Sequence, residues 1–130
     1  MKKPLRILHL EDNALDAELV ESALSADGIE CEVTKVMTRE DYRSALEACG
    51  FDLVLADFAL PSFDGMSALE MASRTCLEVP YIFVSGSMGE EVAVESLKKG
   101  AVDYVLKTNL SRLAPAVRRA LREADDRAAR

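Results

Sequence analysis

The sequence has little of what marks nucleic-acid-binding, membrane or disulfide-rich proteins. It contains no tryptophan and only 5% aromatic residues, and its 16 Lys+Arg against 23 Asp+Glu give a net charge of -7. An acidic chain repels phosphate backbones, so we expect this domain to bind no nucleic acid. Cys31, Cys49 and Cys76 are widely separated and lack metal-ligand spacing, which predicts reduced structural thiols. Without an export signal or an apolar run of membrane-spanning length, we expect a cytoplasmic protein that does not insert into membranes.

What the sequence does contain is a regular alternation of strand-like and helix-like segments. Its 130 residues and 49% hydrophobic content fit one globular domain with its own core. Strands are predicted at residues 5–10, 31–36, 52–56, 81–84 and 102–106, and helices at 14–26, 40–49, 66–76, 90–99 and from about 111 to the C-terminus. Several strands are apolar on both faces, which is typical of a parallel sheet covered by helices on both sides. The pattern predicts an α/β fold with five strands and five helices.

Residue types at the predicted helix ends support these boundaries. Side chains that cap helix N-termini are expected at Asn13, Thr38 and Ser87, each followed three residues later by an acid. Glycines in left-handed backbone are expected to end three helices, at Gly28, Gly50 and Gly100. Pro115 must lie in or near the first turn of the last helix, because a deeper proline would cost about 3 kcal/mol.

Four of the predicted strands end in polar residues of different chemical kinds. These residues are Glu11 with Asp12, then Asp57, Ser85 and Lys107. The carboxyl ends of parallel strands lie on one edge of a sheet, so residues far apart in the sequence converge there. The strand that ends at Val36 contributes no such residue, as expected for an edge strand.

The chemistry of this set indicates metal-assisted phosphoryl transfer. Glu11, Asp12 and Asp57 would repel one another, and Mg²⁺ suits such a cluster because it leaves positions open for phosphate oxygens. Lys107 can pair with a carboxylate in the empty site and with a phosphoryl oxygen in the filled one, while Ser85 adds a hydroxyl donor. Taken alone, each of these residues except Asp57 is more often an ordinary cap or surface group. Their combination favours Asp57 as the acceptor that forms an aspartyl phosphate.

Four segments together closely resemble the receiver domain of two-component response regulators. They are ILHLEDN at 7–13, DLVLADFALPSFDG at 52–65, VSG at 84–86 and GAVDYVLK at 100–107. The resemblance covers nearly the whole chain and implies one receiver domain over residues 1–130. It also implies a flavodoxin-like, doubly wound sheet with strand order 2-1-3-4-5 and a crevice between the first and third strands.

The same resemblance implies a role for each site residue. Asp57 is then the phosphoacceptor, Lys107 pairs with the phosphate, and Ser85 and Tyr104 are the switch residues. The Mg²⁺ ligands would be Glu11, Asp12 and Asp57 with the Ala59 carbonyl. A sensor histidine kinase or a histidine phosphotransfer protein would supply the phosphoryl group, in a two-component system or phosphorelay. The protein would then be a signalling switch that catalyses its own phosphorylation and dephosphorylation, not an enzyme acting on free substrates, and its output partner stays open.

Some residues depart from this pattern or have a second explanation. Thr108 stands where most receivers have a proline in a cis peptide, so the loop after Lys107 is expected to be trans or differently shaped. Tyr104 is equally well explained as a strand aromatic that packs on a helix. His9 lies inside the first apolar run, so it is expected to be a packed neutral imidazole and not a ligand or a phosphorylated histidine. A phosphohydrolase would need a second acid where Ala59 stands. An FMN-binding module would need a phosphate-cradling hydroxyl or glycine cluster after the first strand.

Overall fold

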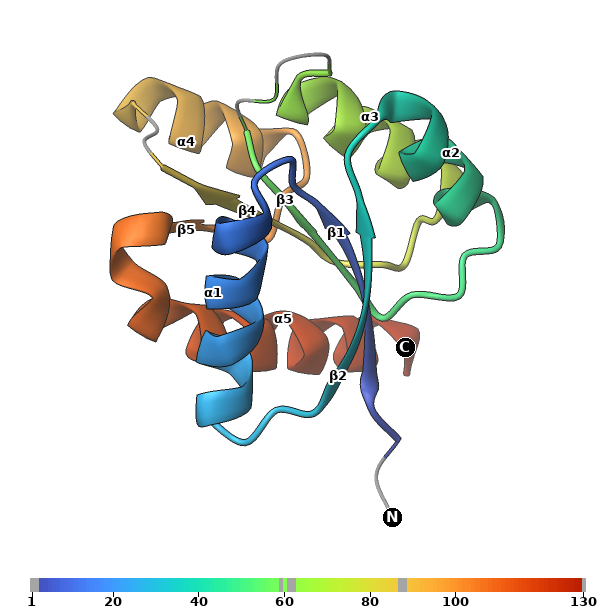
Figure 1. Ribbon diagram of the computed structural model, residues 1–130. Helices are drawn as coiled ribbons and strands as arrows, with labels where there is room; N and C mark the ends of the chain where they lie inside the picture. The colour runs from blue at the N-terminus through green and yellow to red at the C-terminus, as the bar shows by residue number, and fades with distance from the viewer. Residues whose placement is uncertain (1–2, 59, 61–62, 87–88, 130) are drawn as a thin grey trace.

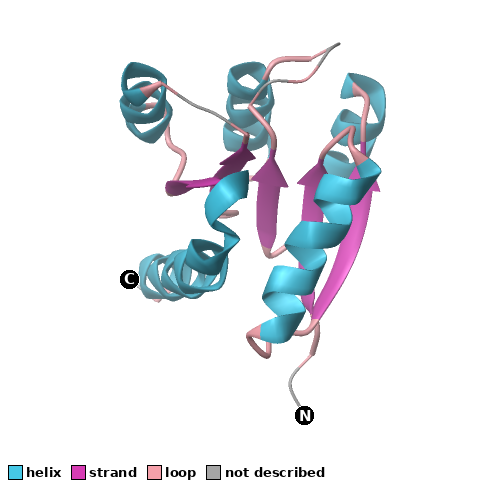
Figure 2. Ribbon diagram, turned by 60° about the vertical axis from the view of Figure 1, so that its left-hand side comes forward, coloured by secondary structure: helices cyan, strands magenta, loops and turns pink. Residues whose placement is uncertain are grey.

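Five strands form one parallel sheet, and helices cover both of its faces (Figures 1 and 2). The computed structural model describes residues 3–58, 60, 63–86 and 89–129. Within them the strands are β1 (Leu5–Leu10), β2 (Cys31–Val36), β3 (Leu53–Ala56), β4 (Tyr81–Ser85) and β5 (Asp103–Leu106). Their order is β2-β1-β3-β4-β5, with every neighbouring pair parallel. This confirms the α/β fold, the strand order and the edge position of β2.

The helices lie in two layers on either side of the sheet. They are α1 (Ala14–Ala26), α2 (Arg39–Glu47), α3 (Gly65–Thr75), α4 (Glu90–Lys98) and α5 (Leu113–Ala128). α1 and α5 cover one face, and α2, α3 and α4 cover the other (Figures 1 and 2). From β1 the chain runs to β2 at one edge of the sheet and then returns to β3 on the opposite side of β1. Because all the connections are right-handed, this reversal of direction places helices on both faces. In open α/β sheets ligands bind where the strand order reverses, which in this sheet is at the carboxyl ends of β1 and β3.

Two apolar layers form the core. Along β1, Leu8 and Leu10 pack with residues of α2 and α3, whereas Ile7 packs with residues of α1 and α5. All residues of the central strands β3 and β4 are buried. Burial on both faces explains why these two strands are continuous apolar runs without alternation.

The helix caps agree with the sequence at two positions and differ at a third. The side chains of Asn13 and Thr38 accept hydrogen bonds from the backbone N–H groups of residues 16 and 41, as predicted. Before α4 the N-cap residue is Gly89, not the predicted Ser87, and within the described residues no side chain caps this helix. Ser87 itself lies outside the described residues.

Left-handed backbone ends three helices, but at one of them the residue is not glycine. Gly28 (φ +81°) and Gly100 (φ +119°) confirm the prediction. After α2 the residue with positive φ is Cys49 (φ +46°), not Gly50. The reason is that α2 ends at Glu47, two residues earlier than predicted, so the turn falls on Cys49, whose N–H donates to the Leu46 carbonyl (2.9 Å).

A 3₁₀ segment precedes the last helix. It spans Lys107–Arg112, and α5 begins directly after it at Leu113, which places Pro115 in the first turn as predicted. The described residues contain no cis peptide bond, so the connection from Lys107 to Thr108 is trans.

The prediction of reduced thiols is wrong for two of the three cysteines. Cys49 and Cys76 form a disulfide, with their Cα atoms 5.6 Å apart, while Cys31 is a free, partly buried thiol. α2 and α3 lie side by side on one face of the sheet and finish at the same edge, which brings together residues separated by 27 positions. Sequence spacing alone did not show this proximity.

Reducing this disulfide is expected to lower the free energy of unfolding by about 3 to 4 kcal/mol, because the unfolded chain loses the restraint of a closed loop. Urea denaturation with and without dithiothreitol measures the difference. The double variant Cys49→Ser/Cys76→Ala serves as the control, since it should match the reduced protein and not respond to the reductant. Equal stability of oxidised and reduced wild type would contradict a structural role.

Within the described part of the chain, every helix is too short or too polar to cross a bilayer.

Candidate functional site

The polar residues that follow the strands meet at the carboxyl edge of the sheet. The backbone N–H of Asp57 donates to the Leu10 carbonyl (3.0 Å), and the N–H of Glu11 donates to the Val36 carbonyl (3.0 Å). Both acids therefore continue the hydrogen-bond ladder of the sheet, which fixes their backbones. One carboxylate oxygen from each of Glu11, Asp12 and Asp57 lies within 4.8 Å of the others. Of these residues Glu11 and Asp57 are buried and Asp12 is exposed, so the cluster faces solvent on one side.

Lys107 inserts its ammonium group among these carboxylates. Its Nζ lies 2.9 Å from Asp57 Oδ2, 2.7 Å from Glu11 Oε1 and 2.7 Å from Asp16 Oδ2. All three contacts are ion pairs, and those with Asp16 and Asp57 are also hydrogen bonds. The predicted proximity of Lys107 and Glu11 to Asp57 is therefore present.

Burial and the neighbouring charges shift the pKa values of Lys107 and Glu11 in opposite directions. Burial alone would lower the pKa of Lys107, but its contacts with Asp16, Glu11 and Asp57 outweigh burial and hold that pKa above its usual range. Burial raises the pKa of Glu11, and the contact with Lys107 opposes this rise. The ammonium therefore compensates part of the repulsion between carboxylates when no other cation is bound.

Of the remaining predicted residues, Ser85 and Tyr104 lie on the neighbouring strands β4 and β5. Ser85 is the last residue of β4, is 1% exposed and pairs in register with Leu106, directly before Lys107. Tyr104 is half-buried on β5 and packs against the core beneath α2 and α3, a position compatible with both of its explanations. Ala59 lies outside the described residues.

Comparison with known proteins gives the family. Residues 7–118 match the family described as the response regulator receiver domain. This chain belongs to the response regulator receiver domain family. Its members are phosphorylation-dependent signalling switches of two-component systems, not metabolic enzymes.

Three relatives illustrate how closely this receiver domain resembles proteins of known sequence or structure. It is 33% identical over 116 residues to the luminescence regulatory protein LuxO of Vibrio campbellii, covering 88% of this chain and 25% of LuxO. The chain thus spans about a quarter of that relative. A CheY-like receiver domain from Methanospirillum hungatei JF-1 has a TM-score of 0.82 and 28% identity, covering 96% of this chain and 99% of that one. The BeF3-activated DrrB receiver domain has a TM-score of 0.77 and 26% identity, covering 92% and 99%.

A glycine makes room for the receiver domain's strand-end aspartate. Gly65 begins α3, and a Cβ atom there would lie 2.8 Å from Phe58 Cα, 2.8 Å from the Phe83 ring and 3.0 Å from the Asp57 carbonyl oxygen. Two of these contacts are with backbone, which cannot swing away as a flexible side chain could. Only glycine therefore lets α3 approach the chain segment that carries Asp57.

Asp16 is the site residue that sequence reasoning missed. Its position three residues after Asn13 is typical of a helix cap, and its backbone N–H does donate to Asn13 Oδ1 (3.0 Å). The carboxylate of Asp16 contacts Lys107 instead. The sequence contains one indication of this contact. A lysine that follows β5 needs an anionic partner, and the first turn of α1, which carries Asp16, begins at the same edge of the sheet.

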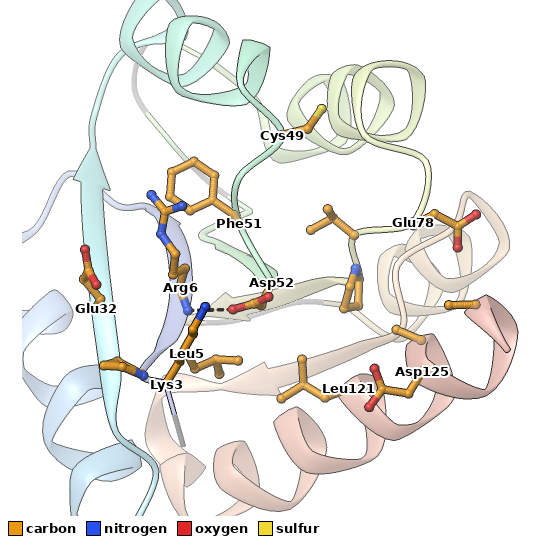
Figure 3. Close-up of a pocket in the computed structure, with 15 residues that line it drawn as sticks. Lys3, Leu5, Arg6, Glu32, Cys49, Phe51, Asp52, Glu78, Leu121 and Asp125 are labelled. Carbon is orange, nitrogen blue, oxygen red and sulfur yellow. Dashed lines mark hydrogen bonds between the residues drawn. The ribbon is translucent and has the colours of Figure 1, made fainter. Parts of the chain in front are cut away.

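A cavity of about 770 Å³ lies at the opposite edge of the sheet, near the start of β1 and the end of α5 (Figure 3). Two of its charged side chains contact neighbours. The Arg6 guanidinium lies over the Phe51 ring (5.5 Å to the centroid), and Asp52 Oδ2 accepts a hydrogen bond from the backbone N–H of Arg6 (2.9 Å). The predicted site residues are not among those that line it. The cluster of Glu11, Asp12 and Asp57 at the carboxyl edge is therefore separate from this cavity.

His9 is a packed imidazole, as predicted. It is 0% exposed on β1, and neither ring nitrogen has a hydrogen-bond partner among the described residues. Burial, with the charge of Lys107, lowers the pKa of His9 from 6.5 to about 4, and Asp57 opposes this shift. The imidazole is therefore neutral at physiological pH.

The lowered pKa of His9 predicts acid sensitivity. In the unfolded chain His9 takes up a proton near pH 6.5, whereas in the folded chain it does so only near pH 4. The free energy of unfolding is therefore highest above pH 6.5 and decreases as the pH falls from 6.5 to 4. We expect a loss on the order of 3 kcal/mol. Urea denaturation of wild type and His9→Leu, without divalent cations, measures it at several pH values. Identical pH dependence in both proteins would contradict the prediction.

Proposed function

We propose that residues 1–130 form one receiver domain that accepts a phosphoryl group onto Asp57 from a phosphohistidine, with Mg²⁺ bound. The carrying observation is that Lys107 Nζ lies 2.9 Å from Asp57 Oδ2, beside a cluster of three carboxylates. An acceptor, a cation site and a phosphate-pairing ammonium then lie together at the carboxyl edge of the sheet. Phosphoryl transfer needs mainly positioning and charge neutralisation, and these groups can supply both.

The carboxylate cluster fits Mg²⁺ by its chemistry. Glu11, Asp12 and Asp57 offer hard oxygen ligands, and Glu11 Oε1 is a buried oxygen without a well-formed hydrogen bond in the described structure. The Ala59 carbonyl is the further ligand that we propose. When bound, Mg²⁺ would neutralise charge on the transferred phosphoryl oxygens.

Asp57, Lys107 and Ser85 would each have a separate role in the transfer. A carboxylate oxygen of Asp57 forms a bond to phosphorus as the bond from phosphorus to the donor's imidazole nitrogen breaks, and that nitrogen keeps the electron pair. Lys107 exchanges a carboxylate partner for a phosphoryl oxygen, and the Ser85 hydroxyl donates to another. The donor would belong to a sensor histidine kinase or a histidine phosphotransfer protein.

The output would come from a shift between two conformations that the phosphoryl group stabilises unequally. Ser85 and Tyr104 are the proposed switch residues, because they lie on the neighbouring strands β4 and β5 beside the site. The surface of α4 next to β5 would bind an output protein. Val94 (48% exposed) and Leu97 (42% exposed) on α4 offer apolar contacts for it.

Labelling with a small phosphodonor tests this function. Incubation with acetyl phosphate and Mg²⁺ should add the mass of one phosphoryl group to the intact protein, and the added group should be labile to hydroxylamine, as an acyl phosphate is. The same incubation with EDTA in place of Mg²⁺ should give no labelling. Equal labelling with Mg²⁺ and with EDTA, or no labelling under either condition, would overturn the proposal.

A further inference from the structure

The first turn of α1 leaves one carboxylate free to point toward the site. Asn13 caps the helix by accepting from the backbone N–H of Asp16 (3.0 Å), which fixes Asp16 at the third helical position. In a capping box the acid at this position would bond back to the N–H of the cap residue. Here the backbone N–H of Asn13 donates instead to Glu11 Oε2 (3.2 Å). Asp16 Oδ2 accepts from Lys107 Nζ (2.7 Å).

The three partners of Lys107 differ in what happens to them during the reaction. A lysine ammonium has three N–H donors, and Lys107 lies within 2.9 Å of oxygens from Glu11, Asp57 and Asp16. Glu11 and Asp57 belong to the cluster that could hold a cation, and Asp57 is the proposed acceptor. Asp16 is not one of the three residues in that cluster. Its contact with Lys107 can therefore persist when a cation and a phosphoryl group take over the other two oxygens.

We propose that Asp16 is a positioning residue, which holds Lys107 beside Asp57 while the phosphoryl group is transferred. This inference rests on the proposed function of the site. The lysine stem is flexible, so its ammonium group needs a fixed partner to stay aimed at one oxygen. Asp16 supplies that partner from a capped helix turn, with a side chain that is 29% exposed, whereas the side chain of Lys107 is only 15% exposed. The contact also ties α1 to the 3₁₀ segment that Lys107 begins.

The test compares rates of labelling by acetyl phosphate in the full chain with saturating Mg²⁺. Asp16→Ala should label about fivefold more slowly, the order expected when a partly exposed charge-assisted hydrogen bond is lost. Asp16→Glu should restore most of the rate, and Asp16→Asn, which keeps an oxygen acceptor and the side-chain shape, should fall between. Glu18→Ala removes an exposed acid from the same helix and should leave the rate unchanged.

Salt and a double-mutant cycle separate anchoring from a general effect of charge. At about 1 M salt the Debye length falls to about 3 Å, so a steering effect of Asp16 on the anionic donor would vanish while the anchoring effect remains. In a Lys107→Ala background, Asp16→Ala should change the residual rate by less than the fivefold seen in wild type, because the anchored group is gone.

Three results would overturn the inference. They are an unchanged or faster rate in Asp16→Ala at high salt, the same fivefold loss in the Lys107→Ala background, and no recovery in Asp16→Glu when its melting temperature matches wild type. If the wild-type protein does not label at all, the proposed function fails together with this inference. Normal labelling of wild type and Asp16→Ala alike would overturn only the role of Asp16.

Discussion

Asp57→Asn is expected to abolish covalent labelling by acetyl phosphate while leaving the fold intact. The amide of asparagine is not a nucleophile, so no acyl phosphate can form at this position. The change in shape is small, and the amide oxygen can still accept a hydrogen bond from Lys107, which lies 2.9 Å from Asp57 Oδ2 in the wild type. We therefore expect the free energy of unfolding to change by no more than about 1 kcal/mol.

Intact-protein mass spectrometry measures this labelling, and urea denaturation checks the fold. Asp52→Asn is the matched control, because Asp52 is an exposed aspartate at the other edge of the sheet, where it accepts from the Arg6 N–H (Figure 3). That variant should label like wild type. Stoichiometric labelling of Asp57→Asn would refute the assignment of Asp57 as acceptor.

Lys107→Ala is expected to change cation binding and labelling in opposite directions. Divalent cations should bind more tightly, because the ammonium no longer competes for the oxygens of Glu11 and Asp57, which it approaches at 2.7 Å and 2.9 Å. Labelling by acetyl phosphate should be slower by about tenfold or more, since a hydrogen bond to a charged group contributes about 1.5–3 kcal/mol.

Isothermal titration with Mg²⁺ and labelling kinetics measure the two effects on the same samples. Lys35→Ala provides the control, because Lys35 is an exposed lysine on β2 that pairs at 3.9 Å with Glu21 and not with the cluster. Unchanged cation affinity together with normal labelling in Lys107→Ala would show that this ammonium plays no part in the site.

The strand-end residues could be predicted because two simple regularities determine where they lie. Continuous apolar runs identified buried strands, and a polar residue directly after such a run must leave the sheet at its carboxyl edge. Asp57 after β3 follows this rule. Lys107 also directly follows a strand, the partly buried β5, and the structure places its ammonium 2.9 Å from Asp57 Oδ2. The order of the strands came from the resemblance to receiver domains, since local patterns do not specify which strands are neighbours.

The features that sequence reasoning missed depend on contacts between distant segments. The Cys49–Cys76 disulfide joins the ends of two helices whose proximity follows from the sheet order and not from spacing. The left-handed residue after α2 is Cys49 because the helix stops early, and glycine preference alone pointed to the next position. The local sequence around Asp16 indicates only a helix cap, because its partner, Lys107, lies 91 residues away. Local rules thus identified the residue types, but not every partner.

The most direct test of the account is a crystal structure of the protein grown with Mg²⁺ and beryllofluoride, a mimic of the phosphoryl group that binds an aspartate oxygen. The account predicts BeF₃⁻ on the carboxylate of Asp57, Mg²⁺ held by Glu11, Asp12 and Asp57, and the ammonium of Lys107 on a fluorine atom. Asp57 without BeF₃⁻, or Lys107 turned away from the bound group, would contradict it.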